Sequence, residues 1–378
     1  MIPLFRPSYS DEEISAVVSV IKSGWWGSGP EVTKFEKEFS SFIGTSEAVA
    51  LNSGTASLHL AGKVLNLPKG SEVITTPLTF ISTAFLADYN NLKIVFADIE
   101  EDTLNIDPDD IKRKITRKTK VIVPVHYGGH SCRMDEIMEI AKENNLFVIE
   151  DCAHASGASY KGKKLGSIGD IGCFSFQAVK NIATGDGGMI TTNNKEWAEN
   201  VRVLRWVGIT RDTSQRTERE QYNWEYEIRE VGYKFQMTDI AAALGRVQLK
   251  RLPQNNRIRR QITEFYNQQF ASLKWLKTPK QQPYADSSNH NYCIRVNVGT
   301  PEENEKIRNN LILHLKKKRI HSSVHYKPVY LQKVYNHIKV DCPVTDKVWK
   351  SLLLLPIFPD MSEEEMFAVT DAVKSFMD

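Results

Sequence analysis

Short apolar runs alternate with longer amphipathic segments through the first half of this chain. Helix-like segments begin after Ser53 and after Pro77, and two more cover 107–114 and 134–143. Strand-like runs lie at 48–51, 72–76, 93–97, 121–125, 146–149, 171–176 and 188–192. Strands that alternate with helices predict a mainly parallel sheet joined by right-handed crossovers. We therefore predict an α/β fold in which a mainly parallel sheet of seven-stranded type lies between helices.

The second half of the chain predicts a smaller unit. A chain of 378 residues is too long for one simple core and suits a large domain with a smaller one. Residues 208–228 are polar and predict a long surface loop, and helical patterns follow at 237–252 and 258–270. We expect Pro253 to separate these two helices. A strand at 292–298, a helix at 301–318 and a closing helix from 362 complete the pattern. We predict a large domain at 1–250 and a C-terminal α+β domain at 251–378.

Charge and cysteine content limit the classes of partner and compartment. The chain has 49 basic and 46 acidic residues, a net charge of +3, which predicts no nucleic-acid or anionic-membrane partner. It has no signal-peptide core, and its apolar runs are shorter than the ~18 residues of a membrane span. Five cysteines without paired spacing favour free thiols in a reducing compartment. We expect a cytoplasmic protein without a metal site.

One lysine and one aspartate lie at the ends of predicted buried strands. Lys180 is on a loop between the strands at 171–176 and 188–192, where a lysine by itself is most often a solvated cation. Asp151 follows the strand at 146–149, at the sheet edge where open α/β sheets bind ligands. A lysine that can form a Schiff base and an acid that can hold a pyridinium nitrogen are the two groups that pyridoxal phosphate needs.

Two further stretches have both an ordinary and a functional interpretation. The sequence Ser53-Gly-Thr-Ala56 follows a strand and opens a helix, so it can cradle a phosphate group or simply cap the helix. Taken alone, this stretch favours the cap. Trp25 and Trp26 occupy a glycine-rich turn, where two tryptophans can plug the edge of a core or cover a ligand. The sequence favours neither role for the turn.

Six short motifs follow one another in a specific order. They are Ser53-Gly-Thr-Ala56, Thr76-Pro-Leu-Thr-Phe80, Glu150-Asp-Cys-Ala-His154, Phe174-Ser-Phe-Gln-Ala-Val-Lys180-Asn181, Gly185-Asp-Gly-Gly188 and Gly232-Tyr-Lys-Phe-Gln-Met-Thr-Asp239. This order resembles that of the nucleotide-sugar aminotransferases of the DegT–StrS family, pyridoxal phosphate enzymes of fold type I with an aspartate aminotransferase-like fold. The likeness extends from the turn at 24–30 to residues 355–359 and covers nearly the whole chain.

The resemblance implies a role for each of three residues at the cofactor ring. Lys180 binds the cofactor and later moves a proton between the substrate and cofactor carbons, for which it must be a neutral amine. Asp151 keeps the pyridine nitrogen protonated. His154 lies near the 3-hydroxyl of the ring, although an isolated histidine after a strand more often makes a structural hydrogen bond.

The remaining cofactor contacts are also implied by the resemblance. Phe80 is expected to stack on the ring, although a phenylalanine at the start of a helix is more often part of a core. The residues expected to hold the phosphate group are Thr55, Ala56 and Ser175. Many members of the family carry an asparagine in the stretch that corresponds to Tyr233–Met237, and it reaches the partner subunit's phosphate; here the polar candidates are Lys234 and Gln236. We favour Gln236, because an amide is closest to the asparagine, and expect a homodimer with shared active sites.

The implied substrates are an amino donor and a sugar. Trp25, Trp26, His325 and Tyr326 are expected to contact the sugar nucleotide, although a buried Tyr/His cluster is an equal interpretation of residues 323–330. We expect an amino group to move from glutamate to a nucleoside-diphosphate-linked 4-keto-6-deoxy sugar, for polysaccharide assembly such as that of lipopolysaccharide O-antigen. A 3-keto sugar is the second candidate. A non-catalytic sensor or regulator with this fold is the rival from another class, and the presence of both Lys180 and Asp151 argues against it.

Overall fold

The computed structural model describes residues 1–210 and 226–377, and in this range its main sheet has seven strands. Their order is β1-β9-β8-β5-β4-β2-β3. The strands are β1 (Glu47–Leu51), β2 (Glu72–Thr75), β3 (Lys93–Phe96), β4 (Thr119–Val123), β5 (Phe147–Asp151), β8 (Ile171–Ser175) and β9 (Gly188–Thr192). β9 is antiparallel to β1 and β8, and the other neighbouring strands are parallel. The predicted mainly parallel sheet is therefore confirmed, and each strand begins and ends within two residues of its prediction.

Side chains of alternate residues divide between two apolar cores, one on each face of the sheet. In β1, Ala48 and Ala50 belong to one core, while Val49 and Leu51 belong to the other. The first core also contains residues of α2 (Pro30–Ile43), α5 (Pro108–Lys114) and α6 (Met134–Asn144). The second contains residues of α3 (Gly54–Val64), α4 (Ile81–Tyr89) and α7 (Lys195–Arg205). Successive side chains of a strand point to opposite faces of the sheet, and both faces are covered here. Each strand is therefore apolar along its whole length and appears in the sequence as a continuous apolar run.

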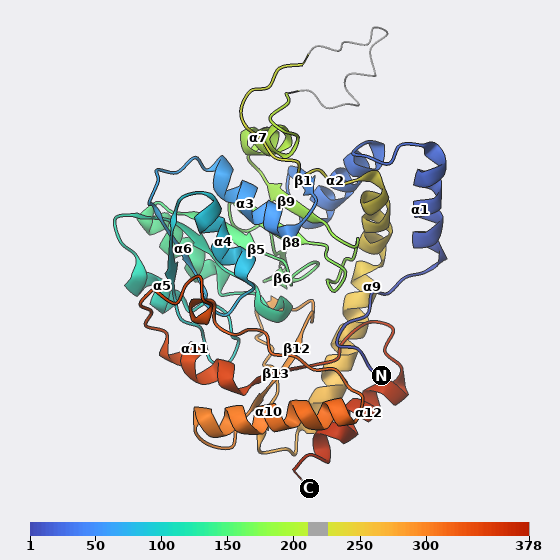
Figure 1. Ribbon diagram of the computed structural model, residues 1–378, viewed down its shortest axis with the longest axis vertical. Coiled ribbons are helices and arrows are strands. Elements are labelled where there is room, and N and C mark those ends of the chain that lie inside the picture. Colours follow the sequence, from blue (N-terminus) through green and yellow to red (C-terminus); the bar gives the residue numbers. More distant parts are fainter. Residues whose placement is uncertain (211–225, 378) are drawn as a thin grey trace.

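The C-terminal part has its own apolar core, in the lower half of Figure 1. A sheet of β10 (Leu276–Lys277), β12 (Tyr292–Val296) and β13 (Leu352–Leu355) packs there with α10 (Pro301–Lys317) and α12 (Glu363–Lys374). A second small sheet contains β6 (Ser159–Tyr160), β7 (Lys163–Lys164) and β11 (Ala285–Asp286). Apart from the long helix α9 (Asp239–Phe270), the remaining described elements are α1 (Asp11–Ser23), η1 (Tyr127–Gly129), η2 (Val329–Leu331), α11 (Pro343–Val348) and η3 (Trp349–Ser351).

One long helix replaces the two that the sequence predicted. α9 (Asp239–Phe270) runs without interruption through Pro253, so the predicted break there is wrong. A proline inside a helix removes one hydrogen bond and costs ~3 kcal/mol. α9 is buried on both sides of this point, through Leu249 and Leu252 in one core and Tyr266 and Phe270 in another. This packing offsets the local cost.

The division at residue 250 stays a prediction, and residue 250 lies inside α9. The residues 211–225 of the predicted surface loop lie outside the described range. Among the helices of the described residues, none is both long enough and apolar enough to cross a lipid bilayer.

Candidate active site

Asp151 is the last residue of β5 and is almost fully buried at the carboxyl edge of the sheet. Its carboxylate accepts hydrogen bonds from Thr83 Oγ1 at 2.7 Å and from the backbone N–H of Ala153 at 3.0 Å. Burial raises the pKa of Asp151, whereas these two hydrogen bonds and the charge of Lys180 act in the opposite direction. A buried carboxylate in this balance favours a cation beside it.

Lys180 follows β8 on the loop that leads back to β9. The backbone N–H of Lys180 donates to the Gln177 carbonyl at 2.8 Å, which closes a tight turn. Burial lowers the pKa of Lys180 to about 8, against the charge of Asp151, which raises it. A substantial fraction of this amine is therefore neutral near physiological pH, as a nucleophile requires.

His154 and Tyr326 form a hydrogen-bonded pair beside Lys180. The backbone N–H of Gly128 donates to His154 Nδ1 at 3.3 Å, so Nδ1 carries the lone pair. Burial lowers the pKa of His154 well below its ordinary value, and the charge of Lys180 acts in the same direction. The ring is thus neutral, and its Nε2–H donates to the Tyr326 hydroxyl at 3.0 Å. The Tyr326 hydroxyl proton remains available for another acceptor.

His325 lies next to this pair. Its ring stacks on that of Tyr326, with the centroids 4.6 Å apart. Burial lowers the pKa of His325 to about 4, and the charge of Lys180 acts in the same direction. Its Nδ1 is buried without a hydrogen-bond partner among the described residues. A buried polar atom without a partner is costly unless a ligand satisfies it.

The start of α3 lies against the end of β8. A Cβ atom on Gly54 would come within 2.8 Å of Ser175 Cβ, so only glycine allows this approach. The N–H of Ala56 donates to the Ser53 hydroxyl at 3.1 Å, which is the ordinary helix cap. The hydroxyl of Thr55 is 2.7 Å from that of Ser82. Thr55 and Ser175 therefore provide hydroxyl groups at one helix N-terminus, whereas the Ala56 N–H is already used.

Phe80 and the segment around Lys234 border the same sheet edge. Phe80 precedes α4, is 58% exposed, and its ring centroid lies 6.4 Å from that of Tyr326. The N–H of Asn52, just before α3, donates to the carbonyl of Phe235 at 2.8 Å. Lys234 Nζ donates to Gln236 Oε1 at 3.3 Å, so both side chains share one face, as alternation along an extended segment requires. Lys234 Nζ also lies 3.4 Å from the Trp206 ring centroid.

The indole N–H groups of the tryptophan turn are bonded to nearby backbone carbonyls of the same segment. Trp25 Nε1 donates to the carbonyl of Ser28, and Trp26 Nε1 to that of Ile21, both at 3.1 Å. Trp26 is 56% exposed. Asp239, at the start of α9, accepts a hydrogen bond from Gly29 N–H. The structure therefore assembles Asp151, Lys180, His154, His325 and Tyr326, and leaves the sugar contact of Trp25 and Trp26 as a prediction.

Three residues around Lys180 were given no role from the sequence, although Asn181 is part of the lysine motif. Asn181 Oδ1 lies 2.9 Å from His290 Nδ1, and Asn181 Nδ2 donates to Asn256 Oδ1 at 2.8 Å. They come from the lysine loop, from the segment before β12 and from α9. No local pattern marks a residue whose partners are this distant in sequence.

A buried group resembling a metal site lies behind Asp151. Atoms of His126, Glu150 and Cys152 lie within 4.8 Å of one another. Glu150, however, accepts from His126 Nε2 and from the N–H groups of Gly166, Ile168 and Gly169. His126 Nδ1 accepts from Cys132 N–H. These groups hold the loop before β8 in place.

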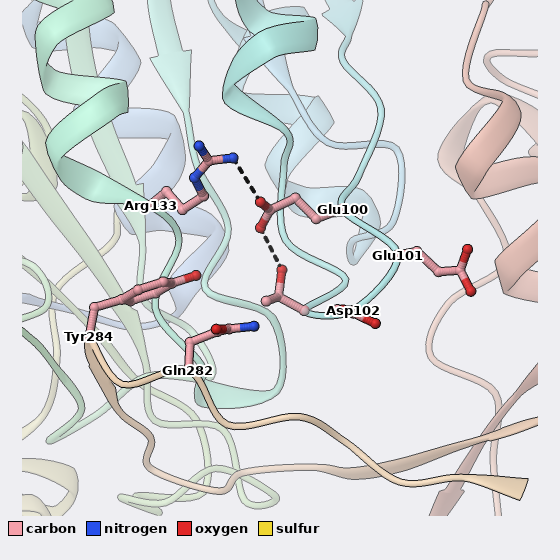
Figure 2. A pocket seen from close by; sticks show the side chains of 7 residues that line it. Glu100, Glu101, Asp102, Arg133, Gln282 and Tyr284 are labelled. Atoms are coloured by element: carbon pink, nitrogen blue, oxygen red, sulfur yellow. Dashed lines mark hydrogen bonds and ion pairs between the residues drawn. The ribbon is translucent and has the colours of Figure 1, made fainter.

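An acidic pocket of about 610 Å³ lies elsewhere, between the loop after β3 and the segment before β11. Figure 2 shows the guanidinium of Arg133 turned toward Glu100, and Arg133 Nη1 donates to the Glu100 carboxylate at 3.0 Å. Thr103 Oγ1 also donates to the Glu100 carboxylate, at 2.8 Å. Tyr284 and Gln282 form the opposite wall. None of the site residues predicted from the sequence lines this acidic pocket.

The chain is similar to known proteins over its full length. The model of the DegT/DnrJ/EryC1/StrS aminotransferase family matches residues 7–374. The uncharacterized protein MJ1066 of Methanocaldococcus jannaschii is 44% identical, over 100% of this chain and 97% of its own. The spore coat polysaccharide biosynthesis protein SpsC of Bacillus subtilis is 41% identical, with the same coverage. The crystal structure of the sugar aminotransferase CalS13 from Micromonospora echinospora has a TM-score of 0.88 and 29% identity, and covers 99% of this chain and 100% of that one.

Proposed function

This chain belongs to the DegT/DnrJ/EryC1/StrS aminotransferase family, and from that premise we propose that it transfers an amino group from L-glutamate to a nucleoside-diphosphate-linked 4-keto-6-deoxy sugar, with pyridoxal phosphate as cofactor. The observation that carries the proposal is the pairing of Lys180, whose pKa burial lowers to about 8, with buried Asp151 at one sheet edge. The likeness to CalS13 and to a polysaccharide biosynthesis protein supports a sugar as the acceptor.

The residues at this edge fit pyridoxal phosphate. The cofactor, when bound, supplies an aldehyde that takes up an amine and a ring that accepts an electron pair. Asp151 would hold the ring nitrogen in its protonated form, because the buried carboxylate favours a cation beside it. Lys180 would bind the aldehyde and, as a neutral amine, move a proton at the substrate carbon. The exposed ring of Phe80 offers an aromatic surface for stacking.

The phosphate end is supported by neutral donors. Thr55 and Ser175 lie at the N-terminus of α3, where the helix dipole favours an anion. The phosphate group carries close to two negative charges. We propose that the partner subunit of a cytoplasmic homodimer completes the cradle, through Gln236 in preference to Lys234. Two contacts within its own chain, to Gln236 Oε1 and to the Trp206 ring, engage the Lys234 ammonium group, whereas the same hydrogen bond uses only the carbonyl oxygen of Gln236 and leaves its amide N–H groups as donors.

We assign recognition of the sugar to His325 and to the hydroxyl group of Tyr326, which also pairs with His154. Nδ1 of His325, which has no partner among the residues that the structure describes, and the hydroxyl proton of Tyr326 are proposed as a hydrogen-bonding site for the sugar nucleotide. Trp25 and Trp26 are proposed to cover the same ligand from the glycine-rich turn.

The proposal is tested by incubating the protein with pyridoxal phosphate, L-glutamate and a panel of nucleotide-linked 4-keto and 3-keto sugars, with products analysed by mass spectrometry. We expect replacement of the keto oxygen by an amino group in a 4-keto-6-deoxy sugar. Lys180→Ala is the matched control and should give no product and no visible cofactor absorbance. Failure of the wild-type protein to bind the cofactor would instead support a regulator, and borohydride labelling of a different lysine would refute the assignment of Lys180.

A further inference from the structure

Three contacts converge on His290, which lies in the segment between β11 and β12 and is 1% exposed. Its Nδ1 is 2.9 Å from Asn181 Oδ1, next to Lys180 in sequence. Its ring stacks on that of His154, with centroids 4.6 Å apart and planes 30° apart. The ring of Phe5, from the N-terminal segment, stacks on His290 at 5.4 Å and 6°.

The direction of the hydrogen bond between His290 and Asn181 follows from the other contacts of Asn181. Asn181 Nδ2 lies 2.9 Å from the carbonyl oxygen of Ser288, which can only accept. The amide nitrogen therefore faces Ser288, and Oδ1 must accept from His290. Burial lowers the pKa of His290 well below its ordinary value, and the charge of Lys180 acts in the same direction. His290 is thus a neutral ring that donates through Nδ1–H.

This arrangement fixes two parts of the candidate site. Asn181 is held by His290, by Ser288 and by Asn256 of α9, so the backbone at the base of the Lys180 side chain has little freedom. His154 lies in a stack between His290 and Tyr326, whose ring centroid is 6.0 Å away with the planes 12° apart. The orientation of the His154 ring is therefore set from both sides.

We propose that His290 is a positioning residue, whose Nδ1–H holds Asn181, and through it Lys180, while its ring orients His154. The inference rests on the proposed function, because that function assigns Lys180 and His154 to the cofactor. Aligned reacting groups are worth much of a catalytic rate, and a displacement of about 1 Å can cost about a hundredfold.

Two substitutions separate the two parts of this role. His290→Phe keeps an aromatic ring against His154 but has no N–H for Asn181, whereas His290→Gln can donate to Asn181 but has no ring to stack. The first readout uses the cofactor-free protein: the pH dependence of Lys180 acetylation by acetic anhydride, followed by peptide mass spectrometry. We expect a midpoint near the wild-type pKa of about 8 in His290→Gln. In His290→Phe the midpoint should move upward by about one unit, because the released loop exposes the amine to water.

The second readout is turnover of the loaded enzyme, expressed as kcat and KM. His290→Phe should lower kcat about tenfold to a hundredfold with a smaller change in KM, because the defect lies in alignment. His314→Phe is the matched control: this half-buried histidine packs on Phe376 at 5.6 Å in the C-terminal part, and we expect wild-type values in both assays. Wild-type midpoint and kcat in His290→Phe would overturn the proposal.

A double-substitution cycle tests the connection between His290 and Asn181. It also keeps the proposal testable if thermal melting shows that His290→Phe is poorly folded. Asn181→Ala removes the acceptor and should shift the Lys180 midpoint as His290→Phe does. The double variant should shift the midpoint no further than Asn181→Ala alone, because the hydrogen bond that His290→Phe breaks is already lost when Asn181 is replaced. Additive shifts would show that His290 and Asn181 act separately. If borohydride labels another lysine, the proposed function fails, whereas the midpoint in the cofactor-free protein is still measured independently.

Discussion

Asp151 and Lys180 are connected by charge, and each should change the chemistry of the other. Asp151→Asn retains the shape of the side chain but removes the charge that would keep the cofactor nitrogen protonated. We expect this variant to bind pyridoxal phosphate and to turn over slower by about a hundredfold or more, measured as kcat under saturating substrate. Asp170→Asn is a control, because Asp170 accepts from Val148 N–H at the opposite end of β5. Near-normal turnover of Asp151→Asn would show that another group protonates the ring.

The lowered pKa of Lys180 predicts how cofactor capture depends on pH. Only the neutral amine attacks an aldehyde, so capture by the cofactor-free protein should rise about tenfold per pH unit below pH 8 and level off above it. An ordinary lysine would continue to rise toward its pKa of 10.5. Because the charge of Asp151 raises the Lys180 pKa, Asp151→Asn should shift the midpoint below 8. Stopped-flow absorbance over a pH series measures both, and a rise that continues to pH 10 in wild type would contradict the lowered pKa.

Single residues also show where sequence reasoning stops. Lys180 and Asp151 could be identified because each lies in a recognisable motif next to a strand end. His290 could not, because its partners Phe5, His154 and Asn181 come from separate segments that only the folded chain brings together. The N–H of Ala56 donates to the Ser53 hydroxyl, which is the helix cap that this stretch favours when taken alone, and the contact of Ala56 with a phosphate group stays a prediction.

Among the secondary-structure elements, the strands were predicted well because both faces of the sheet are covered, so each strand is a short apolar run. The prediction for α9 was wrong because it assumed that the low helix propensity of Pro253 ends the helix. Burial along both halves of α9 instead keeps the helix continuous through Pro253. The resemblance to the aminotransferase family is confirmed by the match over residues 7–374, and it gave the fold type more directly than periodicity could.

The proline in α9 gives a stability prediction. Pro253 is exposed, so Pro253→Ala restores a backbone N–H without disturbing either core. We expect the free energy of unfolding to rise by about 1–3 kcal/mol, as measured by urea denaturation. Gln254→Ala, at the next exposed position, should stay within about 0.5 kcal/mol of wild type. A loss of stability in Pro253→Ala would mean that the ring of Pro253 makes contacts that the helix needs.

For the whole molecule, the proposed shared site links assembly to cofactor retention. Gln236→Ala should lose more cofactor on dialysis than Lys234→Ala, because Gln236 is the proposed donor to the partner's phosphate group. Dilution that separates the subunits should release cofactor in the same concentration range, as followed by light scattering and absorbance. The reverse order of the two variants would assign the contact to Lys234. A monomer that keeps its cofactor would contradict a shared site.

The long helix α9 also has a mechanical consequence for Lys180. The two halves of this continuous helix are packed in different cores, so the parts of the chain before and after residue 250 are not joined by a flexible hinge there. Its most compliant point is Pro253, where one rung of the hydrogen-bond ladder is absent. Asn256, less than one turn further along, holds Asn181. Bending of α9 at Pro253 would therefore displace Asn256 and, through its hydrogen bond to Asn181, the backbone that carries the Lys180 side chain.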